Sequence, residues 1–325
     1  MISAYKLENG KLEELERSSN VEHTEEAEVF ICTDPDQEEK LFVQEEFDLG
    51  QHTLASVLDE NELPRIESRD DKIVIICKHP LHIGVINSNI EFRVTSLGAV
   101  IYEDRIVFVF NEAIPHREFL MGAMSRVNDI RDLLINVLHR TTLHFHEHLR
   151  CISLGMEQIE EEVLEYSNSK LLMNLFTLGK SLTYYVSALN GNNTLIERIY
   201  NNTERLGFTS AQKETLDDIR LDSAQCCQEA QITTNIMTKM TDTRISMMGN
   251  NVSNLMKRLT IISLLLMPMN LIAGIGGMSE YTTFMAGCLP GLPMWGSYLI
   301  LGILFLIIGF LTYRLLEKMG LMDLS

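Results

Sequence analysis

The sequence predicts an α+β membrane protein, with an N-terminal cytoplasmic α/β domain and a long stalk helix that continues into the first of two C-terminal transmembrane helices. Three observations favour this fold class. Short runs of β-branched and aromatic residues lie in the first third of the chain. No proline interrupts the stretch from Thr209 to Met267. Residues 259–313 contain one charged residue, Glu280, whereas a soluble domain almost never has so long a stretch with a single charge.

The charge balance argues against a protein that binds nucleic acid. The chain has 27 Lys and Arg against 45 Asp and Glu, a net charge of -18, and binding to phosphates requires basic residues. The six cysteines include no C-x-x-C pair and indicate free thiols in a reducing compartment. The N-terminus has no apolar signal segment, so we expect the head to stay in the cytoplasm. We find no P-loop, no G-x-G-x-x-G, no G-x-S-x-G and no pair of catalytic carboxylates, and therefore do not expect an enzyme.

The α/β region is expected at residues 1–115 and a helical region at 116–208. Residues 103–105 are a plausible hairpin connection between the last two of four predicted strands, which are VFICT (29–33), KIVIIC (72–77), GAVIY (98–102) and IVFVF (106–110). After Pro115, apolar residues recur every three or four positions, which is typical of helices. The polar residues 190–193 are either a turn or a break in this region, and residues 201–208 resemble the loop that ends it.

The stalk helix is expected at residues 209–258. Thr209 and Gln212 have the spacing of a capping box, in which a hydroxyl and an amide side chain bond the free backbone amides at a helix start. A helix from 210 to 277 would be on the order of 100 Å long at ~1.5 Å per residue. Only its last part is apolar enough for lipid, so we expect the rest to project from the membrane.

Two segments are long and apolar enough to span a bilayer, at residues 259–278 and 295–313. The loop between them, residues 279–294, has no Lys or Arg. Basic residues instead precede the first span and follow the second, in the tail at 314–325; they are Lys257, Arg258, Arg314 and Lys318. By the positive-inside rule, both termini are expected in the cytoplasm, with the protein in the inner (cytoplasmic) membrane and the loop outside.

A polar stripe along the first span is the main functional signal. At about 100° per residue, seven side chains fall within one sector about 100° wide; they are Met256, Thr260, Ser263, Met267, Asn270, Gly274 and Gly277. An Asn in hydrocarbon is costly unless it meets a partner or water. The stripe therefore faces either a neighbouring helix, as ordinary packing, or an aqueous path.

An aqueous path would require an oligomer, because two helices per chain cannot enclose a channel. With the stripe toward the axis, the methionines would form constrictions, and Thr260, Ser263 and Asn270 would replace water around a cation. Pro268 favours a bend, which suits a gate or a kinked structural helix equally well. At the outer end, Glu280 would form a ring of carboxylates that concentrates cations, or it is one solvated acid in a loop. Extending the stripe inward reaches Asp242.

A histidine-rich stretch offers a second possible metal site. His144 and His148 share one helix face at i, i+4, with Glu147 beside them, which is reasonable spacing for zinc. A solvated helix explains the same residues. If the stretch binds metal, we expect a regulatory cytoplasmic site and no catalysis. Acidic clusters such as Asp34–Glu39 are expected to be solvated surface, or else to bind regulatory metal between subunits.

The segment Asn254–Glu280 resembles the signature region of the CorA family of divalent-cation transporters. The shared pattern is Lys257, the Leu-Thr-Ile-Ile run at 259–262, Pro268, and Ile-Ala-Gly-Ile at 272–275 leading into Gly277 and Met278. The resemblance implies a homopentamer in the lipid bilayer, with the first span lining the pore as far as Gly277, Met278 and Ser279 and the second span surrounding it. It also implies passive movement of divalent metal cations as substrate, no required cofactor, and regulation by cytoplasmic metal between subunits.

One residue departs from the pattern of that family. The family ends its pore helix with Gly-Met-Asn, and here Ser279 stands in the third position. A serine presents one hydroxyl where the amide presented a carbonyl, so the substitution bears on magnesium selectivity. The zinc-transporting branch and the branch named CmaX are similar as well, and the resemblance implies a cargo of the magnesium, zinc, cobalt or nickel class. The alternative is a non-conducting, membrane-anchored metal sensor or scaffold that keeps the fold.

Overall fold

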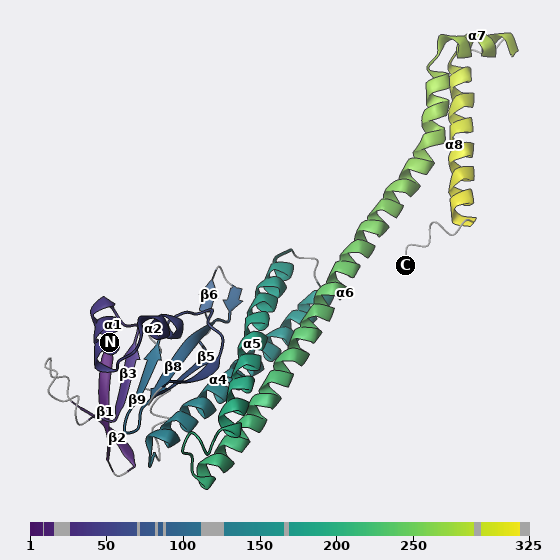
Figure 1. Ribbon diagram of the computed structural model, residues 1–325. Helices are drawn as coiled ribbons and strands as arrows, with labels where there is room; N and C mark the ends of the chain where they lie inside the picture. The colour runs from purple at the N-terminus through teal and green to yellow at the C-terminus, as the bar shows by residue number, and fades with distance from the viewer. Residues whose placement is uncertain are drawn as a thin grey trace. The chain divides into compact units, whose positions relative to one another are not determined.

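The computed structural model describes residues 1–8, 10–15, 27–69, 72–81, 84–86, 89–111, 127–165, 169–288 and 294–318. The chain divides into two compact units, Met1–Asp242 and Thr243–Ser325. The long helix α6 (Ser210–Gly276) begins in the first unit and ends in the second (Figure 1).

In the described residues of the first unit, seven strands form one sheet in the order β2-β1-β3-β9-β8-β5-β4. The pair β3–β9 is parallel and the other neighbours are antiparallel. The strands are β1 (Ile2–Glu8), β2 (Lys11–Glu14), β3 (Val29–Thr33), β4 (Arg65–Arg69), β5 (Lys72–Pro80), β8 (Val94–Ile101) and β9 (Ile106–Phe110). The short strands β6 (Gly84–Ile86) and β7 (Asn89–Glu91) pair with each other. The four strands predicted from the sequence are β3, β5, β8 and β9, and residues 103–105 lie between β8 and β9 as expected.

Alternating side chains bury both faces of the sheet, as the period of two in a strand requires. In β9, Val107 and Val109 face helices α1 (Gln37–Glu46) and α2 (Gln51–Val57). Ile106, Phe108 and Phe110 face the opposite side, where α4 (Ile130–Glu165), α5 (Ser169–Asn201) and the start of α6 pack. The first unit is thus an α/β layer structure with helices on both sides of the sheet (Figure 1).

The polar residues 190–193, predicted as a turn or a break, lie inside helix α5. Two contacts explain why the helix continues there. Gly191 has no side chain, and an added Cβ would lie 2.6 Å from Pro64 Cγ. The Asn192 side chain donates to the Lys78 carbonyl and accepts from the Lys78 amide, each at 2.8 Å, and so holds α5 against β5. The polar residues therefore serve the contact with the sheet and do not end the helix.

Helix α6 begins with the predicted capping box. The Thr209 amide donates to Gln212 Oε1 at 2.9 Å, and the Gln212 amide donates to Thr209 Oγ1 at 3.3 Å. The first part of the expected stalk does not project freely, because several of its side chains are buried against α4 and α5; they are Leu216, Ile219, Cys226, Ala230 and Met237. Residues 210–242 therefore belong to the first unit.

The second unit contains the end of α6 and the helices α7 (Ser279–Cys288) and α8 (Met294–Lys318). The first predicted span, 259–278, lies in α6 as far as Gly276, where the helix ends, and the second lies within α8. The first part of the predicted outer loop is helical, since α7 begins at Ser279. The sequence of α7 permits a helix because it has no proline and its glycine comes near the end. The predicted helical start at 116 and the tail after 318 lie outside the described residues.

Candidate functional site

Helices α6 and α8 lie side by side and run antiparallel within the second unit (Figure 1). A Cβ added to Gly276 would lie 2.3 Å from Leu301 Cδ2, and one added to Gly309 would lie 2.4 Å from Met269 Cε. Ile261 and Ile272 are the most buried apolar residues in this part of α6, at 9% and 8% exposure. Glycine on each helix thus lets a side chain of the other lie against its backbone, and small residues are usual at contacts between transmembrane helices.

The predicted polar stripe lies on the other side of α6. At about 100° per residue, the positions of Ile261, Ile272 and Gly276 centre about 180° from the stripe. Every stripe residue is exposed in the chain, with Met256 at 59% and Met267 at 71%; the other exposed residues of the stripe are Thr260, Ser263, Asn270, Gly274 and Gly277. Packing against α8 therefore does not explain the stripe, because α8 covers the opposite face.

The hydroxyls of the stripe bond their own helix. Thr260 Oγ1 donates to the Met256 carbonyl and Ser263 Oγ donates to the Leu259 carbonyl, both at 2.9 Å. Each hydroxyl proton is thus engaged, and the oxygen lone pairs remain to accept from water or to contact a cation. Among the described residues, no heavy atom outside the helix backbone lies within 4 Å of a Cβ added to Gly274, so the surface of the stripe is open there.

The C-terminal end of the stripe is a tight turn between two helices. Helix α6 ends at Gly276, and the amides of Gly277 and Met278 still donate to the carbonyls of Ala273 and Ile275, at 3.0 and 3.2 Å. Ser279 is the first residue of α7, and its Oγ lies 3.3 Å from Glu280 Oε2. The turn therefore brings a hydroxyl and a carboxylate together where the stripe ends.

Of the two charged residues predicted along the path, Glu280 is exposed at this turn, in the first turn of α7, whereas Asp242 is exposed at the end of the first unit. Pro268 lies inside α6, which continues through it. The proline therefore does not divide the predicted span into two helices.

The histidine stretch is arranged differently from the expected metal site. His148 is buried, and its Nδ1 lies 2.7 Å from Tyr185 Oη. The ring of His144 lies 4.6 Å from that of His148 and 5.2 Å from that of His79 on β5, measured between centroids, whereas Glu147 is exposed. Sequence spacing could not reveal His79, because it lies far away in the chain. Across the part of the chain that the structure describes, no group of three or more His, Cys, Asp or Glu could hold a metal ion.

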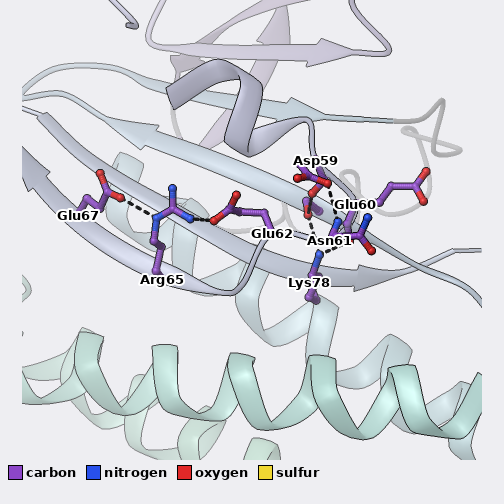
Figure 2. Close-up of polar contacts among 8 residues, drawn as sticks. Asp59, Glu60, Asn61, Glu62, Arg65, Glu67 and Lys78 are labelled. Atoms are coloured by element: carbon purple, nitrogen blue, oxygen red, sulfur yellow. Dashed lines mark hydrogen bonds and ion pairs between the residues drawn. The ribbon is translucent and has the colours of Figure 1, made fainter. Parts of the chain in front are cut away.

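A second polar cluster surrounds Lys78 (Figure 2). The Lys78 ammonium donates to the Glu60 carbonyl and, at 2.9 Å, to Ser96 Oγ. Burial lowers the pKa of Lys78, and the nearby Asp59 and Glu62 carboxylates oppose that shift. In the same cluster, Arg65 contacts both Glu62 and Glu67. The basic side chains drawn in Figure 2 thus lie against acidic residues and carbonyls of the same unit.

The buried cysteines are poor candidates for metal ligands. Burial raises the pKa of the Cys32, Cys77 and Cys226 thiols to about 12. At neutral pH these groups are protonated thiols, whereas a metal ligand is the thiolate. All six cysteines are free, as the sequence predicted.

Two helices in the described part of the chain, α6 and α8, contain segments long and apolar enough to cross a membrane. A family model described as "CorA-like Mg2+ transporter protein" matches residues 29–315. The chain belongs to this family. It is therefore a membrane protein of the CorA type, and the predicted resemblance is confirmed.

Two CorA relatives match most of the chain. The "Cobalt/magnesium transport protein CorA" of Methanocaldococcus jannaschii is 24% identical over 259 residues, covering 76% of this chain and 78% of the relative. The protein of the same name from Thermotoga maritima is 22% identical over 251 residues, covering 74% of this chain and 69% of the relative.

Solved structures of CorA-type proteins share the fold. The complete CorA magnesium transporter from Methanocaldococcus jannaschii matches with a TM-score of 0.75 at 19% identity, over 98% of both chains. The full-length CmaX protein matches with a TM-score of 0.71 at 13% identity, over 98% of this chain and 97% of the other. The N-terminal α/β domain, the long helix and the C-terminal apolar helix are thus the elements of a CorA-type chain.

Proposed function

We propose that this CorA-family protein conducts divalent metal cations across the cytoplasmic membrane through a homopentamer, with both termini in the cytoplasm. Its relatives are named cobalt/magnesium transport proteins, which supports cobalt or magnesium as the cargo. Zinc and nickel belong to the same class of cargo. The expected substrate is thus a small, strongly hydrated cation.

The placement of the polar stripe on α6 is the observation that carries this proposal. Helix α8 covers the face of α6 that contains Ile272 and Gly276, and the stripe points the other way. A row with Thr260, Ser263 and Asn270 facing lipid would be costly, since their polar groups would lack water. Around a symmetry axis the same row lines a shared aqueous path.

The stripe has the chemistry for a hydrated divalent cation. The hydroxyl oxygens of Thr260 and Ser263 and the amide oxygen of Asn270 are hard ligands of the kind that magnesium accepts, directly or through its waters. The methionines of the stripe, Met256 and Met267, would form apolar rings that close by dewetting. At the two ends, Glu280 would attract cations at the outer mouth, and Asp242 would do so at the inner end.

Ser279 is the position at which this chain should differ from its relatives in selectivity. In the proposed pore, Gly277, Met278 and Ser279 form the outer mouth. A hydroxyl offers a smaller acceptor than an amide carbonyl, so a hydrated ion is held less firmly there. We therefore expect broader selectivity among divalent cations than a ring of asparagines would give.

Regulation by cytoplasmic metal would need ligands from more than one chain. Within one chain, the described residues hold no set of metal ligands, and Glu147 does not complete the pair formed by His144 and His148. A regulatory divalent cation would therefore bind between acidic surfaces of adjacent subunits. No resident cofactor is required for the proposed transport.

Flux into proteoliposomes tests this function. The full chain is reconstituted around a dye that responds to divalent cations, and magnesium, cobalt, nickel and zinc are supplied outside. We expect metal-dependent flux, which Asn270→Leu abolishes because an apolar ring at that level dewets. Ile262→Leu, a conservative change away from the stripe, is the matched control and should conduct normally.

The same assay separates transport from the competing role. If the reconstituted wild type passes none of the four metals, the protein is a membrane-anchored sensor or scaffold with a CorA fold. If Asn270→Leu and Ile262→Leu both conduct as the wild type does, the ions take another route.

A further inference from the structure

We propose that helix α7 is an interfacial helix, whose apolar face lies in the outer headgroup region of the bilayer. This inference requires that α6 and α8 span the membrane, but it does not require that the protein conducts ions. It concerns a helix, Ser279–Cys288, in a segment for which the sequence predicted a loop.

Chain connectivity places the start of α7 at the membrane surface. The stretch from Leu259 to Gly276 is about 27 Å long at ~1.5 Å per residue, close to the ~30 Å of a hydrocarbon core. Gly276 therefore lies near the outer edge of that core. Gly277 and Met278 alone separate it from α7, and they can span at most about 10 Å.

The larger apolar side chains of α7 share one side of the helix. At about 100° per residue, Tyr281, Phe284, Met285 and Cys288 fall within one sector about 100° wide. The opposite side contains Ser279, Thr283 and Gly287, and Glu280 lies at the boundary between the two sides, beside Phe284. Phe284 is 68% exposed in the chain, so its ring is not covered by the described residues of this subunit.

One hydrogen bond indicates which way the apolar face points. Tyr281, on the apolar face, donates from its hydroxyl to the carbonyl of Ser297 at 3.2 Å. Ser297 lies in the first turn of α8, which descends into the membrane. The bond therefore turns the apolar face of α7 toward the body of α8, and α7 lies across the end of the helix pair (Figure 1).

A lipid surface fits this face better than water or another protein segment. Tyr and Trp are enriched where helices meet headgroups, and Phe is common on the apolar face of interfacial helices. Trp295 at the start of α8 is 69% exposed at the same level, which extends the aromatic surface. The polar side of α7 is mostly hydroxyl and has no basic residue, so the attachment depends on apolar insertion and not on anionic lipid.

Tryptophan fluorescence in vesicles of defined composition tests this placement. The chain has a single tryptophan, so Trp295→Phe removes all native tryptophan fluorescence. Into it we place Phe284→Trp on the apolar face, with Thr283→Trp on the polar face as the matched control. The full-length variants are reconstituted into phosphatidylcholine vesicles with or without bromine on the acyl chains.

We expect brominated lipid to quench Phe284→Trp at least about twofold more than Thr283→Trp, and emission from the former to lie further to the blue. Aqueous acrylamide should quench Thr283→Trp more. Met285→Trp is a second apolar-face variant and should behave like Phe284→Trp.

Two results would overturn the proposal. Equal, strong acrylamide quenching of all three variants would place α7 in water. Protection of Phe284→Trp from both quenchers would show that another copy of the chain covers this face. Neither result depends on metal flux, so failure of this proposal is distinct from failure of the proposed function.

Discussion

At the scale of single residues, Asn192 shows how a polar side chain in a helix can complete a sheet. Strand β4 pairs with β5 only as far as Ile76, so among the described residues the backbone of Lys78 has no strand beside it on that edge. The amide group of Asn192 supplies both hydrogen bonds that a strand would have made. Buried backbone groups left without partners would be costly.

Asn192→Leu should therefore destabilise the first unit. Losing both bonds leaves a buried N–H and a buried C=O without partners, at a cost of at least about 2 kcal/mol. For a unit the size of Met1–Asp242, that corresponds to a fall in Tm of roughly 4–8 °C. Thermal unfolding of the full chain in detergent, followed by circular dichroism, measures it. Thr194→Ala, an exposed position on the same helix, should leave Tm nearly unchanged, and an equal fall for both variants would refute this role of Asn192.

Polar residues were predicted least accurately from the sequence. Asn190 to Asn193 have the composition of a turn, but this segment contacts β5, Pro64 and Cys227 of α6, which are all far away in the chain. The acidic cluster that includes Asp36 and Glu39 was expected to be solvated surface; Asp36 is exposed, but the sequence analysis missed that both residues also cap the start of α1. Tertiary partners are invisible to a local pattern, whereas Thr209 and Gln212 were found because a capping box is local.

At the scale of elements, the two faces of α6 have different roles. Gly276 and Ile272 face α8, and the stripe with Gly274 faces away from it. The periodicity of the span predicted the stripe because polar residues in lipid are rare and conspicuous. Periodicity could not predict helix α7, because a segment of ten residues between two membrane spans fits a loop equally well.

Two glycines of α6 should respond differently to the same substitution. Gly276→Val must displace Leu301, because even a Cβ would lie 2.3 Å from that side chain, so we expect a lower Tm. Gly274→Val meets open space, so we expect an unchanged Tm but reduced metal flux. Thermal unfolding and proteoliposome flux, measured on both variants, check the assignment. If Gly274→Val lowers Tm and Gly276→Val does not, the assignment of the two glycines to the two faces of α6 is wrong.

At the scale of the whole molecule, the proposed path needs several copies of the chain. One chain supplies one stripe, which is exposed along its whole length. The second membrane helix lies on the far side of α6 and cannot close a pore with it. The family resemblance implies five copies, arranged with the stripes toward a common axis.

Native mass spectrometry of the detergent-solubilised protein tests the number of copies. We expect a mass five times the monomer mass of 37.0 kDa, after subtraction of bound detergent. A stable dimer, or a monomer that persists as the concentration is raised, would contradict the pentamer.

Thiol modification tests most directly whether the stripe is in contact with water and lines the path of the ions. Ser263→Cys in proteoliposomes should lose metal flux by about tenfold when a cationic methanethiosulfonate reagent is added, because the attached charge blocks a narrow pore. The wild type and Ile272→Cys, whose side chain faces α8, should be unaffected. Unchanged flux through modified Ser263→Cys would contradict the account.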